Sequence, residues 1–125
     1  ANKIPEALWL HFGFDVENPN RWKMQKLGQL ISPLDVVAGG NRKQHAVEKL
    51  SYSGADGTVT VESLHAPLVS VGSRNLYNLD DKIESMEDGF YFNLFNNRWG
   101  TNFKMWCSDD CLFDFVIRIE TNPQI

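Results

Sequence analysis

The sequence has few cysteines, and this limits the kinds of site that it can form. Only two occur among 125 residues, Cys107 and Cys111, and the three histidines are far from one another along the chain. A structural zinc site normally takes four Cys or His ligands at short spacings. Two cysteines also do not make a disulfide-rich scaffold. We therefore expect no metal and no other cofactor in this chain, and two cysteines that are reduced and packed.

The sequence also lacks a basic stripe and a long apolar run. Its 12 Lys and Arg residues are scattered among 16 Asp and Glu residues, which gives a formal net charge of -4. Binding to a phosphate backbone needs clustered positive charge. A membrane-spanning helix needs about 20 consecutive apolar residues, whereas the apolar runs here are only a few residues long. Neither nucleic acid nor a membrane is an expected partner.

What the sequence does contain is a series of short segments in which apolar and polar residues alternate. This period of two is typical of a strand that has one face on a core. The clearest example lies at 111–120, where every second residue is apolar: Cys111, Phe113, Phe115, Ile117 and Ile119. We expect this face to be buried.

Further strands are predicted along the chain. Segments 46–52 and 58–64 predict a hairpin, because Gly54 and Gly57 in the intervening turn can adopt positive φ angles. Alternation also predicts strands at 8–14 and 89–95, with Phe90, Phe92 and Leu94 on one face. Shorter extended pieces are expected at 22–27, 34–37 and 68–71, and a loop or weak helix at 80–88. The pattern predicts an all-β fold, an antiparallel β-sandwich that forms one domain over residues 1–125.

One candidate for ligand contact is the segment 33–45. It passes from a short apolar run into the pair Gly39-Gly40 and then carries Asn41, Arg42 and His45. Such a loop can present polar groups to a ligand, or it can be a plain connection whose polar side chains are solvated. It lacks the Lys-Ser/Thr ending of a phosphate-binding loop, so a nucleotide is not expected.

A second candidate is the segment 93–106, in which aromatic and amide side chains alternate closely. Sugar sites combine aromatic faces for C–H groups with amide donors for hydroxyls. Asn97, Trp99 and Asn102 have this chemistry. Alternatively, the aromatic residues fill the core and the asparagines fix turns. No catalytic residue is predicted, because Asp80-Asp81 and Asp109-Asp110 are neighbours that point to opposite faces of an extended chain rather than across a substrate.

Three segments carry a family resemblance: 34–42 (LDVVAGGNR), 63–69 (SLHAPLV) and 93–103 (NLFNNRWGTNF). Over residues 8–119 the chain resembles the C-terminal region of large bacterial and fungal proteins that are similar to α-mannosidases of glycoside hydrolase family 38. The resemblance implies a fragment of a galactose mutarotase-like super-sandwich. It also implies a separate catalytic domain, which would hold a zinc ion and a carboxylate nucleophile. The Asp-x-His pair of that zinc site is not found in this sequence, so no catalytic residue is carried over.

The resemblance leads to an expectation about function. We expect a domain excised from the C-terminal part of a larger chain, which is not itself an enzyme and docks on the catalytic domain of its parent. By analogy it completes one wall of a carbohydrate cleft, with supporting roles for Asn41, Arg42, His45, Asn97, Trp99 and Asn102. Two alternatives stay open: an independent carbohydrate-binding module, and a structural interaction domain with no ligand.

Overall fold

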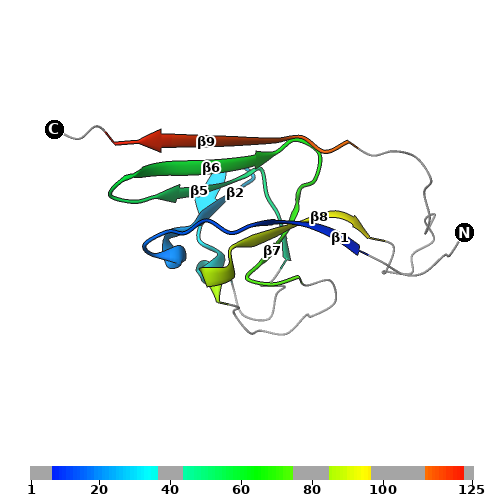
Figure 1. The fold of residues 1–125 in the computed structure, drawn as a ribbon. Helices are drawn as coiled ribbons and strands as arrows, with labels where there is room; N and C mark the ends of the chain where they lie inside the picture. Colours follow the sequence, from blue (N-terminus) through cyan, green and yellow to red (C-terminus); the bar gives the residue numbers. More distant parts are fainter. Residues whose placement is uncertain (1–6, 37–43, 75–84, 97–111, 123–125) are drawn as a thin grey trace, which may run out of the picture.

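The alternating segments fold into two antiparallel β-sheets, which confirms the predicted all-β sandwich (Figure 1). The computed structural model describes residues 7–36, 44–74, 85–96 and 112–122. The smaller sheet has the strand order β1 (Ala7–Phe12), β8 (Phe90–Asn96), β7 (Leu68–Val71) and β4 (Gln44–Ala46). The larger sheet has the order β3 (Gln29–Ile31), β2 (Lys23–Lys26), β5 (Lys49–Ser53), β6 (Gly57–Ser63) and β9 (Phe115–Thr121).

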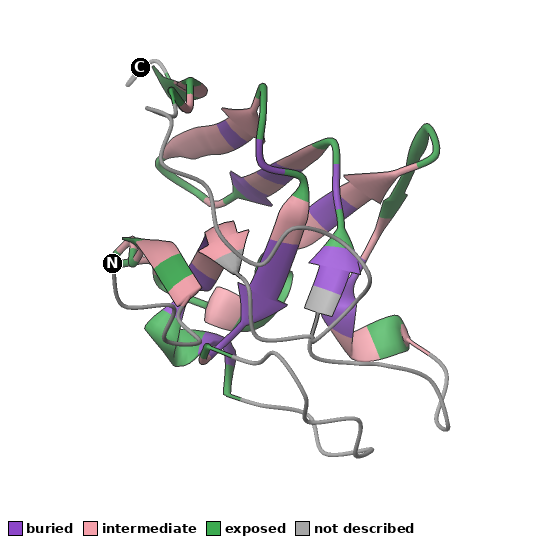
Figure 2. Cartoon of the chain, turned by 90° about the vertical axis from the view of Figure 1, so that its right-hand side faces the viewer, coloured by how far each residue is buried: buried purple, intermediate pink, exposed green. Residues whose placement is uncertain are grey.

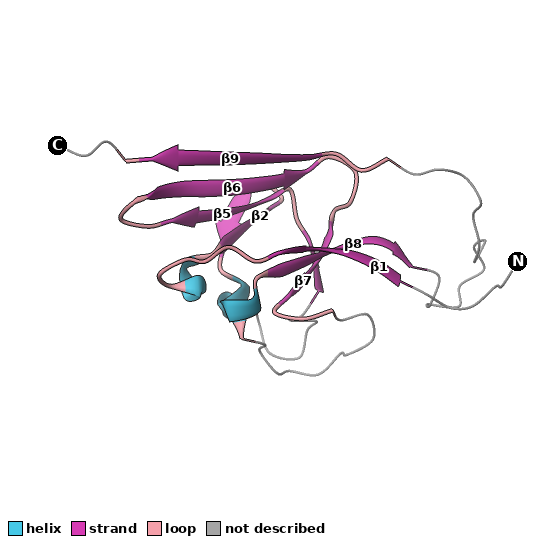
Figure 3. Ribbon diagram, viewed as in Figure 1, coloured by secondary structure: helices cyan, strands magenta, loops and turns pink. Residues whose placement is uncertain are grey.

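Three short 3-10 turns complete the described secondary structure (Figure 3). They are η1 (Pro19–Arg21), η2 (Pro33–Asp35) and η3 (Met86–Asp88). Within the described ranges, no helix has the length and apolar character needed to cross a membrane.

The core lies between the two sheets and is built largely from aromatic rings. Trp22, next to β2, meets Phe90 of β8 edge to face, with ring centroids 5.2 Å apart. Phe92 of β8 meets Phe115 of β9 in the same way at 5.1 Å. Aromatic pairs favour this arrangement because the positive ring edge faces the negative ring face. Figure 2 shows buried segments on strands of both sheets. The buried core cluster consists of Trp22, Met24, Val47, Leu50, Tyr52, Val61, Val69, Val71, Met86, Phe90 and Phe92.

The predicted strand at 46–52 is in fact two strands in different sheets. The Val47 N–H donates to the Pro67 carbonyl at 2.9 Å, beside the smaller sheet. The next N–H, that of Glu48, donates to the Gln25 carbonyl of β2 at 2.8 Å. The chain therefore passes from one sheet to the other at this point. The predicted hairpin is confirmed for β5 and β6, whereas β4 is a separate strand.

The extended piece predicted at 34–37 is wrong for the residues that the structure describes. They lie in or directly after the turn η2. Pro33 stands at the start of this turn, where its fixed φ angle is favourable. The Ser32 side chain accepts a hydrogen bond from the Leu34 N–H at 3.2 Å. The segment is therefore held by a local hydrogen bond within the turn and not by pairing with a neighbouring strand.

The predicted burial of the C-terminal strand is wrong for its second half. β9 begins at Phe115, which packs against the core, but Ile117 and Ile119 are 44% and 65% exposed. The reason is position, because β9 is the last strand of the larger sheet. Figure 1 shows the smaller sheet below the beginning of β9 rather than below its end. An apolar face of this sheet is therefore left partly open.

Candidate functional site

Of the six residues predicted to support a sugar site, the structure describes only His45. It lies in β4 opposite Val69 of β7 and is 4% exposed. The other five lie outside the described residues: Asn41, Arg42, Asn97, Trp99 and Asn102. A supporting role for these six residues stays a prediction.

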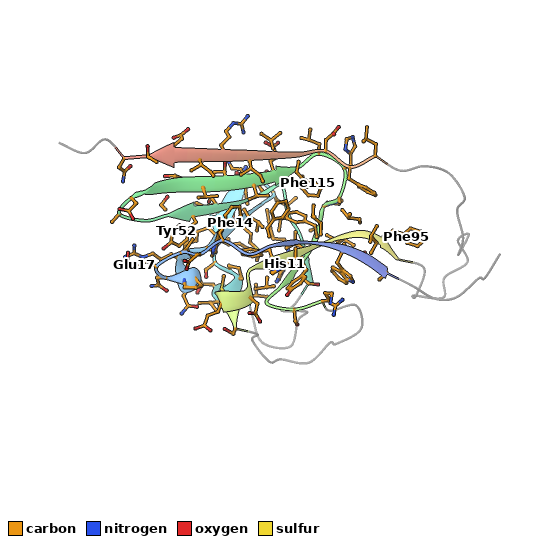
Figure 4. The ribbon with its side chains drawn as sticks, viewed as in Figure 1. His11, Phe14, Glu17, Tyr52, Phe95 and Phe115 are labelled. Atoms are coloured by element: carbon orange, nitrogen blue, oxygen red, sulfur yellow. The ribbon has the colours of Figure 1, made fainter. Side chains whose placement is uncertain are left out.

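A hollow of about 200 Å³ lies at one end of the larger sheet, where β5 turns into β6 and β9 ends. Its apolar lining comes from Val16, Tyr52, Val59 and Ile119. Among the residues that the structure describes, no Lys, Arg or His lines the hollow, whereas four carboxylate residues do: Asp15, Glu17, Asp56 and Glu120. In Figure 4, Glu17 and Tyr52 lie at the same end of the molecule.

Hydrogen bonds tie the end of β9 to the β5–β6 turn that forms one wall of this hollow. The Gly54 N–H donates to the Gly57 carbonyl at 2.9 Å and closes the turn. The Asn122 backbone N–H donates to the Asp56 carbonyl at 2.8 Å, and its side-chain amide donates to the Ala55 carbonyl at 2.7 Å. The turn and the end of β9 therefore hold each other in place.

Tyr52 belongs to the apolar lining of the hollow and is held both at its hydroxyl and at its ring. Its hydroxyl accepts a hydrogen bond from the Asn18 N–H at 3.1 Å. Its ring packs against Trp22, with centroids 5.4 Å apart. The hollow thus combines a rigid apolar floor with carboxylate acceptors, a combination suited to a ligand that has hydroxyl or N–H donors on an apolar frame.

Sequence reasoning did not identify this hollow. Its acidic residues come from the segment after β1, from the β5–β6 turn and from the end of β9. Of these, only the turn carried a sequence signal, through Gly54 and Gly57. The gathering of the carboxylates depends on how the strands pair.

The hairpin between β2 and β3 carries a second unusual feature, an exposed leucine at its tip. Leu27 is 95% exposed and has a φ angle of 51°, and Gly28 follows with a φ angle of 77°. Two-residue turns with positive φ at both positions favour Asn-Gly or Asp-Gly. A leucine in this left-handed region costs about 1 to 2 kcal/mol. Leu30, on β3, is 58% exposed as well.

The hairpin is held firmly despite this strain. The side-chain amide of Gln25 donates to Glu48 Oε2 at 2.8 Å, and the Gly28 N–H donates to Glu48 Oε1 at 3.3 Å. Glu48 directly precedes β5, so its carboxylate connects β2 and the turn of the hairpin to the rest of the larger sheet. Leu27 is therefore presented to solvent from a fixed position.

Two further polar arrangements lie among the described residues. The His11 ring stacks on Tyr91, with centroids 4.2 Å apart, and its Nε2 hydrogen-bonds to the Asp88 carbonyl. The Asp114 N–H donates to His65 Nδ1 at 3.1 Å. In the parts of the chain that the structure describes, no three His, Cys, Asp or Glu residues are grouped so that they could hold a metal ion.

Compared with protein-family models, with curated proteins and with solved structures, the chain gives no match. The resemblance to glycoside hydrolase family 38 therefore stays a prediction.

Proposed function

We propose that this chain is an accessory β-sandwich domain of an α-mannosidase-like glycoside hydrolase protein, and that it docks on the catalytic domain of its own polypeptide through the β2–β3 hairpin. The observation that carries the docking surface is the exposed, conformationally strained Leu27. The sequence resemblance supplies the identity of the partner. In this proposal, the two sheets belong to a galactose mutarotase-like super-sandwich, and zinc and the carboxylate nucleophile belong to the partner domain.

The exposed leucine is unfavourable for an isolated domain in two ways. It leaves a side chain in water whose complete burial is worth about 1.5 to 3 kcal/mol. It also occupies a backbone conformation that Asn or Gly would adopt at lower cost. Local features that conflict with folding preferences are often retained for function. A projecting apolar tip, with a second exposed leucine, Leu30, on the adjoining strand β3, is the kind of surface that inserts into a pocket of another domain.

The substitution Leu27→Asn separates docking from folding. Asparagine tolerates the left-handed conformation, so the free energy of unfolding of the domain should stay the same or rise by up to about 1 kcal/mol. In the full-length gene product, however, loss of the apolar tip should increase hydrogen–deuterium exchange at the hairpin amides about tenfold, because docking no longer protects them.

Leu112→Asn is the matched control, because Leu112 is 78% exposed but precedes β9 rather than lying in the hairpin. It should leave exchange at the hairpin unchanged. Equal exchange in the wild-type protein and in the Leu27→Asn variant would contradict docking through this tip.

The hollow favours a second candidate function, direct contact with carbohydrate. Its apolar floor suits the C–H face of a sugar, and its carboxylates can accept hydrogen bonds from hydroxyl groups. Titration with methyl α-mannoside and with mannobiose should then give a saturable change in tryptophan fluorescence, since Trp22 lies behind Tyr52. Asp56→Asn should weaken this binding about tenfold, as expected for the loss of one charged hydrogen-bond acceptor.

Glu87→Gln is the control for this titration, because Glu87 is an exposed acid in η3 that does not line the hollow. It should bind sugar as the wild-type protein does. A fluorescence signal that does not saturate, or that is the same in the Asp56→Asn variant, would remove the hollow as a sugar site and leave the docking role alone.

A further inference from the structure

Among the strands that the structure describes, β9 has an open outer edge. Within the described part of the chain, β9 pairs on one side only, with β6, over seven residues. Its sequence, FVIRIET, contains no proline and no lysine, and its ladder with β6 has no bulge. Proline, lysine and bulges are features by which proteins commonly prevent the addition of a further strand at an edge. This edge is therefore able to accept another strand.

The hydrogen bonds at the two ends of the β6–β9 ladder show which backbone groups face outward. The Leu64 N–H donates to the Asp114 carbonyl at 2.9 Å, and the Asn122 N–H donates to the Asp56 carbonyl at 2.8 Å. Because bonding alternates along an antiparallel strand, the even-numbered residues of β9 bond to β6. The odd-numbered residues direct their N–H and C=O groups to the open edge: Phe115, Ile117, Ile119 and Thr121.

The same odd-numbered residues carry the open apolar surface. Directly opposed residues in a ladder place their side chains on one face. Ile117 is opposite Val61 and Ile119 is opposite Val59. Val61 is fully buried and Val59 packs against the core, so both isoleucines lie on the core-side face. The neighbouring charged residue, Arg118, lies on the other face, with its Nη1 3.7 Å from Glu62 Oε2.

We propose that β9 pairs antiparallel with β9 of a second copy of this chain, with Ile119 opposite Ile119 on the two-fold axis. In this register Arg118 lies opposite Glu120 of the second copy, and the pair occurs twice by symmetry. Ile117 lies opposite Thr121 of the second copy. The outward-directed backbone groups of Ile117, Ile119 and Thr121 then find partners, and the two Ile119 side chains lie side by side at the axis.

The charges distinguish this register from those in which the two-fold axis passes through another residue of β9. Centring on Arg118 or on Glu120 would oppose two like charges on the axis itself. Centring on Ile117 would oppose Glu120 and Asp114, two carboxylates. A two-fold axis that passes between two residues would place odd-numbered residues of one copy opposite even-numbered residues of the other. The outward-directed groups of one β9 would then face residues whose backbone groups bond to β6. Among these alternatives, only the register centred on Ile119 is complementary in both charge and hydrogen bonding.

This surface is separate from the docking hairpin of the proposed function. β9 and β3 are the two opposite edges of the larger sheet. Failure of one proposal therefore leaves the other unaffected.

Sedimentation velocity over a concentration series from about 10 to about 500 µM tests the proposal, since an interface of one strand pair lies at the weak end of known interfaces. The wild-type protein should show a monomer–dimer equilibrium. Arg118→Glu should weaken dimerisation at least tenfold, because both cross-axis pairs become like-charged. Glu120→Arg should do the same. The double substitution R118E/E120R should restore the wild-type dissociation constant.

Glu62→Gln controls for the contact between Arg118 and Glu62 within one copy, and it should leave dimerisation unchanged. Unfolding midpoints of all variants at low concentration should agree, because these charges are exposed. A wild-type protein that stays monomeric throughout the series would overturn the proposal. So would a dimer that tolerates either single charge reversal, or one that the double substitution fails to restore.

Discussion

Replacing Phe92 with alanine should lower the free energy of unfolding by about 3 to 5 kcal/mol, the range for a large buried aromatic side chain. Phe92 is fully buried in the central part of the smaller sheet, opposite Leu10 of β1 and Val69 of β7. Its ring meets Phe12 edge to face at 5.5 Å and Phe115 of the larger sheet at 5.1 Å. The substitution therefore removes contacts that join the two sheets, and leaves a cavity between them. Urea unfolding measures the loss.

Leu8→Ala is the matched control for Phe92→Ala. Leu8 is in β1 of the same sheet but is 56% exposed. Its truncation should change the free energy of unfolding by less than about 0.5 kcal/mol. Comparable losses for the two variants would mean that the core does not lie where Phe92 places it.

The strands that could be predicted from the sequence are those in which a local pattern and the tertiary environment agree. β7 matches the predicted segment 68–71, and β8 buries Phe90 and Phe92 on the predicted face, with Leu94 packed against the core. The β5–β6 hairpin forms where it was predicted, with its turn between Ser53 and Gly57, although Gly54 does not adopt a positive φ angle and the φ of Gly57, 158°, is close to extended. In each case neighbours in the sequence carry the information.

The parts that could not be predicted depend on distant partners. Nothing in residues 46–52 signals that Val47 bonds to Pro67 while Glu48 bonds to Gln25, so the passage between sheets was missed. β8 and β9 show the same alternation, yet β8 lies between two strands and β9 lies at an edge. Periodicity therefore identifies the face that points to the core but not how far the opposite sheet covers it.

The candidate site also combines features that local sequence indicates with features that depend on distant partners. The sugar-contacting segments were chosen by composition, which reports chemistry but not position. Of their six selected residues, His45 alone lies in the described structure, in a strand and buried. The hollow collects carboxylates from three separate segments, and the strain at Leu27 is visible only in its backbone angle. Neither the gathering of these carboxylates nor the strain at Leu27 has a signal in a linear pattern.

Gly89→Ala should destabilise the protein by more than about 3 kcal/mol, through backbone geometry rather than lost packing. Gly89 has φ 79° and ψ -141°, a region that is close to glycine-only. An added Cβ would also collide with the Phe12 carbonyl oxygen. The backbone cannot move away easily, because the Gly89 carbonyl accepts from the Gly72 N–H at 2.9 Å and its N–H donates to Met86 at 3.1 Å.

Gly28→Ala separates the collision from the unfavourable φ angle. Gly28 has a φ angle of 77°, but no heavy atom lies within 4 Å of its added Cβ. Its substitution should therefore cost only the left-handed conformation, about 1 to 2 kcal/mol. Unfolding of both variants in urea measures the two losses in the free energy of unfolding. If the Gly89→Ala variant is too unstable to purify while the Gly28→Ala variant is well folded, the larger loss is still assigned to Gly89→Ala. Equal losses in the free energy of unfolding would show that the space between Gly89, which precedes β8, and Phe12, which ends β1, has room for a side chain. The close approach of these two residues would then not constrain this end of the smaller sheet.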